Sequence, residues 1–181
     1  MKVRSIILLI ALLVGLDQAV KLLIYLFFMD VNFEIIPRVL DFKPFFNSKY
    51  SFVNHSIHKG TGMDAGLIFH IVLFALIWLV VFVFYRFYKR VAPTNKMLDI
   101  SFSLLTAGVL CAYLGILVWK EGVLDFLQLK PFGKIVFDLK DLYINCFVVC
   151  LLISTKRIES KHHIKLKDMA DYLKGLFGGR A

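Results

Sequence analysis

Residues 5–29 of the chain read SIILLIALLVGLDQAVKLLIYLFFM, an apolar stretch that follows the basic residues Lys2 and Arg4. A helix needs about 20 apolar residues to cross the hydrocarbon core of a bilayer, and this stretch supplies that length. A cleaved secretory leader is excluded because the stretch is too long and lacks a small-residue cleavage site. We therefore expect a first membrane-spanning helix over residues 5–29.

Three further apolar runs follow, and together they set the fold class. The predicted spans cover residues 65–85, 98–119 and 135–155. The 181-residue chain is 59% hydrophobic and has a mean hydropathy of +0.75, more apolar surface than one soluble domain of this size can bury. The sequence predicts an all-α membrane protein with four transmembrane helices.

Lys and Arg residues collect at one end of these spans. More than half of the 22 basic residues lie before the first span, between the second and third, and after the fourth. Basic segments of this kind stay on the cytoplasmic side, so we expect both termini in the cytoplasm. The net charge of +9 follows from this placement, and we expect membrane lipids, not nucleic acid, as its partner.

The spans divide the chain into a membrane domain, residues 1–155, and a basic amphipathic tail, residues 156–181. The connection over residues 30–64 is expected to form an outer cap with strands at residues 33–42 and 50–53. The tail is expected to lie on an anionic leaflet, or alternatively to be solvated. No cofactor or metal is expected, and Cys111, Cys146 and Cys150 are interpreted as small packing residues.

Ionisable residues inside the predicted spans are candidates for function, because charge in a bilayer is costly. Asp17 and Lys21 are four residues apart and can pair on one helix face, with Lys21 reaching toward water. Asp138 and Asp141 are three residues apart. Close carboxylates raise the pKa of one of them, but acids also favour the first turn of a helix, and spacing alone favours this capping interpretation.

Four stretches in order carry a family resemblance. They are Asp17-Gln18-x-x-Lys21; Phe46-Asn47 before Tyr50-Ser51-Phe52 and Asn54; Ala107-Gly108 before Gly122-Val123-Leu124-Asp125-Phe126; and Phe137-Asp138-Leu139-Lys140-Asp141-Leu142-Tyr143-Ile144. In this order, and in these positions relative to the spans, they resemble the lipoprotein signal peptidase (signal peptidase II) family.

The resemblance implies an aspartic endopeptidase of the bacterial cytoplasmic (inner) membrane. Such enzymes cut the signal peptide from a prolipoprotein before a lipid-modified Cys, and an extracytoplasmic β-cradle and a small amphipathic helix cover the substrate. The implied partners are the lipid-modified prolipoprotein or its signal peptide, together with membrane lipids. Asp141 matches a catalytic aspartate, and the candidate substrate-binding residues are Asn47, Asn54, Asp17 and Lys21. The family's first-span aspartate, matched by Asp17, also supports the fold.

One catalytic aspartate of the family pattern has no counterpart in this sequence. Alignment on the motifs of the third span puts Gly115 at that position, and no acid occurs between Asp99 and Glu121. The ordinary pair of aspartates therefore cannot form. Asp138, which stands where the family usually has Asn, and Asp125, from the family Asp-Phe pair, are alternative partners for Asp141, as is Glu121.

Three interpretations of the function remain open. The chain is a divergent peptidase with an unconventional partner acid, or a non-catalytic relative that binds lipoproteins or acyl chains. The third interpretation, a small transporter or scaffold, ranks last because the acids lie at the outer ends of the predicted spans and not at mid-membrane.

Overall fold

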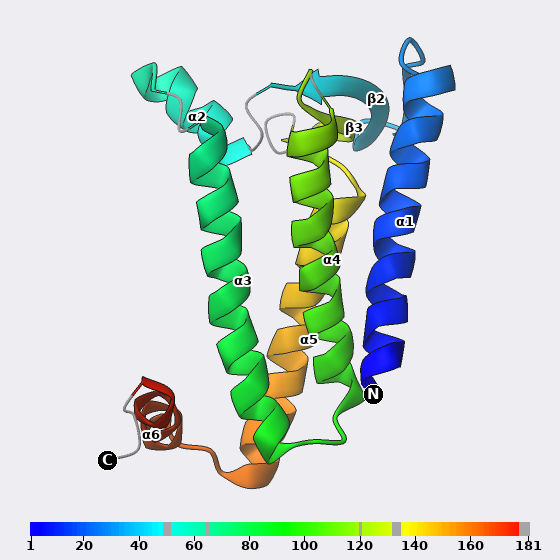
Figure 1. Ribbon diagram of the computed structural model, residues 1–181. Helices are drawn as coiled ribbons and strands as arrows, with labels where there is room; N and C mark the ends of the chain where they lie inside the picture. Colours follow the sequence, from blue (N-terminus) through cyan, green and yellow to red (C-terminus); the bar gives the residue numbers. More distant parts are fainter. Residues whose placement is uncertain (49–51, 64–65, 120, 132–134, 178–181) are drawn as a thin grey trace.

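The computed structural model describes residues 1–48, 52–63, 66–119, 121–131 and 135–177. In this part of the chain, four long helices run side by side (Figure 1): α1 (Val3–Phe27), α3 (Gly66–Val91), α4 (Lys96–Val118) and α5 (Leu139–His162). Three of the described helices, α1, α3 and α4, are long and apolar enough to cross a membrane. The chain is therefore a mostly helical protein with apolar helices of membrane-spanning length.

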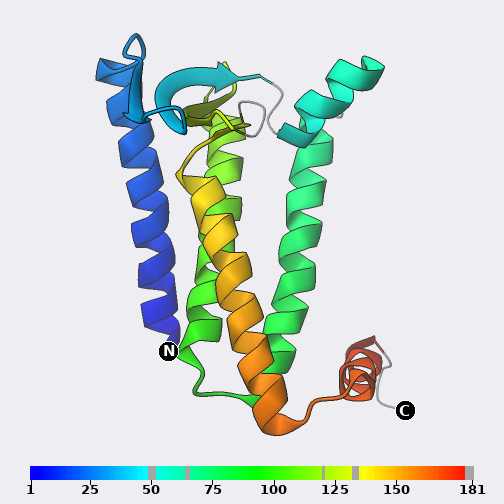
Figure 2. The same ribbon diagram turned by 180° about the vertical axis from the view of Figure 1, so that it is seen from behind.

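The predicted fourth span differs from the helix found there. Residues Ile135–Phe137 form the short strand β4, and α5 begins only at Leu139 and continues to His162. Charged residues near both ends of α5 shorten its apolar middle, so α5 is not among the three helices of membrane-spanning character. It runs alongside α4 in both views (Figures 1 and 2), and its crossing of the bilayer stays a prediction.

A small antiparallel sheet covers one end of the bundle, which we call the sheet end (Figure 1). Within the described residues its four strands follow the order β1 (Phe33–Ile36), β2 (Leu40–Asn47), β3 (Val123–Leu129) and β4. A single strand over residues 33–42 was the wrong prediction, because the chain turns between β1 and β2, where Arg38 has a φ of 63°. The sheet also draws β3 and β4 from outside the predicted cap of residues 30–64.

The strand expected at residues 50–53 is not found where the structure describes the chain. Phe52 and Val53 begin helix α2 (Phe52–Thr61), which lies at the sheet end beside the top of α3 (Figure 1). Tyr50 and Ser51 lie outside the described residues.

Small residues on α4 allow close contact with its neighbours, as the sequence predicts. A Cβ at Gly108 would lie 2.9 Å from Ile144 Cγ1 of α5. Ala107 and Cys111 are fully buried against Tyr143, whose hydroxyl donates to the Leu13 carbonyl oxygen of α1 at 3.1 Å. α4 thus ties α1 and α5 together.

The three cysteines have different environments. Cys111 is buried, which confirms its interpretation as a packing residue, but Cys146 is exposed and Cys150 half-buried. Both lie on α5, where the described residues leave part of the helix surface uncovered.

The end opposite the sheet holds the start of α1 and the last helix, α6 (Leu166–Phe177). The predicted tail of residues 156–181 is thus two segments, because α5 continues to His162 before α6 begins. α6 lies across the long axis of the bundle (Figures 1 and 2). Its Tyr172 ring packs on Phe87 of α3, with the ring centroids 5.4 Å apart.

Candidate active site

The start of α5 is fixed by a reciprocal cap. Asp138 is the N-cap residue and accepts from the Asp141 backbone N–H at 3.4 Å, while Asp141 Oδ2 accepts from the Asp138 backbone N–H at 3.2 Å. This arrangement satisfies two amides that a helix start leaves without partners. The capping interpretation of the Asp138 and Asp141 spacing is therefore confirmed, and the cap holds both carboxylates at the sheet end of α5.

Lys140 stands at the centre of three carboxylates. Its ammonium lies 2.9 Å from Asp138, 3.3 Å from Asp125 on β3 and 3.3 Å from Asp141. One oxygen of each acid lies within 4.8 Å of the others. The Lys140 side chain is only 9% exposed. Its ammonium therefore replaces part of the hydration that the carboxylates lose on burial.

A second buried lysine links this cluster to α1. Lys21 lies 2.9 Å from Asp17 and 2.6 Å from Asp138, and all three side chains are 0% exposed. The predicted pairing of Asp17 with Lys21 is confirmed, but the expectation that Lys21 reaches toward water is wrong. Its ammonium instead turns inward, because the buried Asp138 carboxylate needs a counter-charge.

Each carboxylate oxygen of Asp138 contacts one of the two lysines. Lys21 contacts its Oδ2 and Lys140 its Oδ1, so neither oxygen faces an open space. Asp138 therefore holds α1 and α5 together. It is poorly placed to act on a substrate.

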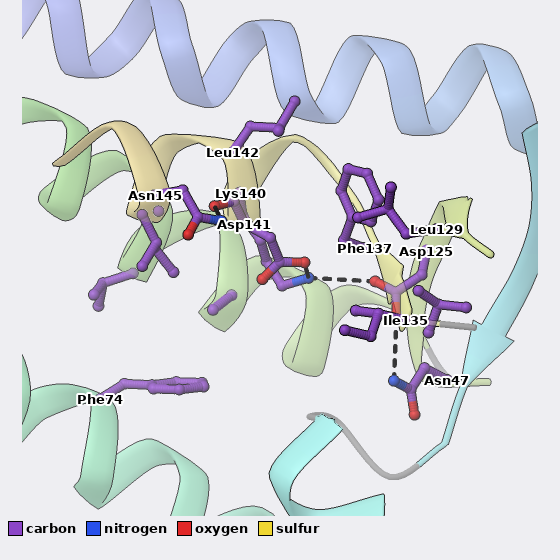
Figure 3. A pocket seen from close by; sticks show the side chains of 15 residues that line it. Asn47, Phe74, Asp125, Leu129, Ile135, Phe137, Lys140, Asp141, Leu142 and Asn145 are labelled. Carbon is purple, nitrogen blue, oxygen red and sulfur yellow. Dashed lines mark hydrogen bonds and ion pairs between the residues drawn. The ribbon is translucent and has the colours of Figure 1, made fainter. Parts of the chain in front are cut away.

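A cavity of about 540 Å³ opens beside the cluster (Figure 3). Its walls come from α3, α4, α5 and the sheet, and most of the lining side chains are apolar. The polar groups converge on one region, where Asn47, Asp125, Lys140 and Asp141 meet. A mostly apolar cavity of this size with a few convergent polar groups is typical of a ligand or active site.

Asp125 and Asp141 reach the cavity from different elements. Asp125 lies on β3 and is 4% exposed, whereas the side chain of Asp141 on α5 is 36% exposed. Asn47 of β2 donates its Nδ2 hydrogen to Asp125 Oδ2 at 3.1 Å (Figure 3). Burial raises the pKa of Asp125 above its ordinary value, and the opposing effect of Lys140 only partly offsets it. The neutral, protonated form of Asp125 is therefore more accessible than that of an ordinary carboxyl group.

The turn before β3 keeps Asn47 and Asp125 in place. Gly122 has a φ of 119°, and a Cβ there would lie 2.5 Å from the Asn47 carbonyl oxygen. Only glycine allows both this backbone conformation and this approach of the two chains. The glycine therefore fixes the pairing of β2 with β3 at the level of the cavity.

The α4 wall of the cavity consists of Gly108, Val109 and Ala112. Gly115, the position matched to the missing aspartate, lies instead against Val123, with 3.3 Å between its Cβ position and Val123 Cγ1. Of these two positions, Ala112 and not Gly115 lies in the wall of the cavity that Asp141 also lines.

The other residues singled out in the sequence fall into two groups. Asn47 lines the cavity, whereas Asp17, Lys21 and Asn54 are buried outside its lining. The exposed Glu121 lies in the turn before β3 and is not part of the wall. The substrate-binding role of Asn54, Asp17 and Lys21 stays a prediction.

Lys140 was missed as a site residue. The sequence signal was a lysine between two aspartates at the start of a predicted span, Asp138-Leu139-Lys140-Asp141. A lysine at such a place needs buried partners. Its third partner, Asp125, is distant enough in sequence that only the fold brings it near.

Comparisons with known proteins agree with this architecture. Two solved structures, both described as bacterial membrane enzymes determined by the in meso method, have the same fold. One aligns with a TM-score of 0.61 at 21% identity, covering 86% of this chain and 94% of its own. The other aligns with a TM-score of 0.67 at 21% identity, covering 91% and 95%. No curated protein matches the chain.

The family comparison covers the four helices, the sheet and the cavity. The model of the family described as "Signal peptidase (SPase) II" matches residues 9–157, which include the Asp17 and Lys21 pair, Asn47, Asp125 and the α5 cap. The chain belongs to the signal peptidase II family of aspartyl proteases that process lipoproteins.

Proposed function

We propose that this protein binds the signal peptide of lipid-modified lipoprotein precursors in the cavity beside Asp141, and cleaves it there. The observation that carries the proposal is the approach of Asp125 and Asp141 at one mostly apolar cavity, with their oxygens within 4.8 Å of each other. Membership of the signal peptidase II family supports the class of substrate. The bacterial inner membrane is the corresponding location, with four spans and both termini on the cytoplasmic side.

In this proposal, Asp141 and Asp125 replace the usual pair of aspartates. An aspartic peptidase needs an ionised carboxylate as base and a protonated one as acid. The more exposed Asp141 removes a proton from water as the water oxygen attacks the scissile carbonyl carbon. Asp125, whose pKa is raised by burial, donates its proton to the carbonyl oxygen. The C–N bond then breaks as Asp141 passes the proton it took from water to the leaving amine, while Asp125 takes a proton back from a hydroxyl of the tetrahedral intermediate.

Asn47 has two roles in the proposed site. Its side-chain amide donates to Asp125, and its position in the cavity wall lets it contact the backbone of an extended peptide. Asp138 and the exposed Glu121 are not proposed as catalytic partners, because both oxygens of Asp138 face lysines and Glu121 lies outside the cavity wall.

A second candidate function is binding without cleavage. It is favoured by Lys140, whose ammonium contacts both proposed catalytic acids. An ammonium in this place stabilises the ionised form of both carboxylates and competes with a water for their oxygens. In this alternative the cavity holds the precursor or its acyl chains, and no amide bond is broken.

The experiment is cleavage of a diacylglyceryl-modified prolipoprotein by the purified protein in detergent. Asp141→Asn and Asp125→Asn are each expected to lower the rate by at least about 100-fold, the size of a general acid or base contribution. Glu121→Gln removes an acid outside the cavity wall and is the matched control, with an unchanged rate. Loss of activity in Asp125→Asn would support Asp125 as the partner acid of Asp141. Full activity in that variant would exclude this pair.

A silent wild-type protein would favour the binding function, and one further pair of variants tests it. Ala112→Asp places a carboxylate in the cavity wall that Asp141 also lines, whereas Gly115→Asp places one against Val123. If the cavity still accepts the precursor, Ala112→Asp is expected to gain cleavage and Gly115→Asp is not. Precursor binding by the wild-type protein, measured with a fluorescent signal peptide, completes the test. Absence of both binding and cleavage would refute both functions.

A further inference from the structure

A second cavity lies at the end of the bundle opposite the sheet, far from the proposed active site. Its volume is about 340 Å³, and it lies between the turn that joins α3 to α4 and the last turns of α5. The turn contributes residues 91–95, and α5 contributes Arg157, Ile158, Lys161 and His162. Unlike the active-site cavity, this one contains no carboxylate in its wall.

The basic side chains of this cavity have no acidic partner among the described residues. Neither Arg157 nor Lys161 forms an ion pair there, although ion pairs hold Lys21, Lys89, Lys130 and Lys140 elsewhere. The nearby Glu159 instead accepts a hydrogen bond from the Tyr88 hydroxyl. Two unpaired cations and a histidine around one hollow form a site for an anion.

The position of α6 relates this cavity to a membrane surface. α6 lies across the bundle axis at the same end (Figure 2), and its Met169, Tyr172 and Leu173 pack on α3. Lys167 and Lys174 stay exposed on α6. A helix that lies across the bundle with exposed lysines is typical of the headgroup region of a bilayer, and the cavity is at that level.

We propose that this cavity binds the phosphate of an anionic phospholipid headgroup. Arg157 supplies a planar group that can donate two hydrogen bonds to phosphate oxygens, and Lys161 supplies a second charge. The ligand chemistry, a phosphate anion, is shared by lipids and by soluble phosphate. The level of the cavity at the end of membrane-spanning helices favours the lipid. This inference does not depend on the proposed peptidase function.

The test is thermal unfolding of the detergent-solubilised protein with added phosphatidylglycerol or phosphatidylcholine. Phosphatidylglycerol is expected to raise the Tm of the wild-type protein, and phosphatidylcholine is not. The double variant Arg157→Gln/Lys161→Gln is expected to need about 30-fold more phosphatidylglycerol than the wild type for the same rise in Tm. Each single variant is expected to need about 5-fold more. Because both residues are exposed, their Tm without lipid is expected to match the wild type.

The matched control removes the same charge from outside the cavity. Lys43→Gln/Lys59→Gln, at the sheet end where both side chains are exposed, is expected to keep the response to phosphatidylglycerol. An equal loss in this control would overturn the proposal, because the effect would then come from general surface charge. An unchanged response in Arg157→Gln/Lys161→Gln would overturn it as well. If inorganic phosphate raises the Tm as much as phosphatidylglycerol does at the same concentration, the phosphate site is supported but its assignment to lipid is overturned.

Discussion

The buried pairing of Lys21 gives the sharpest test of what holds the bundle together. Lys21→Met keeps a long side chain but removes the ammonium that lies 2.9 Å from Asp17 and 2.6 Å from Asp138. Both carboxylates are fully buried; in the variant Asp17 loses its ion-pair partner and Asp138 keeps only Lys140. Breaking one side of a buried ion pair costs about 3–5 kcal/mol. For a protein of this size, that is a fall of about 6–20 °C in Tm.

Thermal unfolding of the detergent-solubilised protein measures this change. Lys43→Met removes an exposed lysine of β2 and is expected to shift the Tm by less than about 2 °C. The triple variant Asp17→Asn/Lys21→Met/Asp138→Asn removes all three charges together, so it is expected to recover most of the lost stability. The reasoning is refuted if Lys21→Met behaves like Lys43→Met, or if the triple variant is no more stable than Lys21→Met.

Three further predictions concern the positioning of the site. Gly122→Ala forces a Cβ to within 2.5 Å of the Asn47 carbonyl oxygen at a φ of 119°, and we expect a loss of about 1–3 kcal/mol, seen as a lower Tm. Gly108→Ala brings a Cβ to 2.9 Å from Ile144 Cγ1 and is expected to lower the free energy of unfolding by about 1–3 kcal/mol. Adding Ile144→Ala should recover part of that loss. No recovery would contradict the close packing of α4 on α5. The raised pKa of Asp125 means that its stabilising contribution is present at low pH and is lost as pH rises through its folded-state pKa. The Tm of Asp125→Asn should therefore improve relative to wild type as pH rises above about 4, the ordinary pKa of Asp, and a constant difference would argue against this shift.

The helices could be predicted from the sequence because a long apolar run in lipid satisfies its backbone hydrogen bonds by forming a helix. The runs over residues 5–29, 65–85 and 98–119 correspond to α1, α3 and α4, although α3 continues six residues beyond its predicted end, to Val91. The sheet could be predicted only in part: Lys120, Glu121 and Gly122 mark the end of the apolar run, but no local signal identifies Val123–Leu129 as a strand that pairs with β2. Its pairing with β2 depends on Gly122, whose close contact with Asn47 is a property of the fold.

The site could be predicted where a motif is local, and not where it is assembled from distant residues. The pair of Asp17 and Lys21 and the cap of α5 each lie within one helical turn, so their spacing is informative. The contacts of Lys21 with Asp138 and of Lys140 with Asp125 join residues far apart in the sequence. Spacing therefore indicated the pairing of Asp17 with Lys21 and the cap formed by Asp138 and Asp141, but it assigned Lys21 to water and gave Lys140 no role.

The absence of a carboxylate from the α4 wall of the cavity and the presence of Lys140 are two parts of one electrostatic arrangement. With no carboxylate on the α4 wall of the cavity, Asp125 and Asp141 are the acids that remain to face it. Lys140 makes its shortest contact with Asp138, at 2.9 Å, and longer contacts of 3.3 Å with Asp125 and Asp141. A substrate amide and a water that displace only the two longer contacts would leave the ion pair with Asp138 intact. The proposed cleavage therefore requires Lys140 to withdraw to Asp138 when the cavity fills, because that movement would free Asp125 and Asp141 to face a scissile bond.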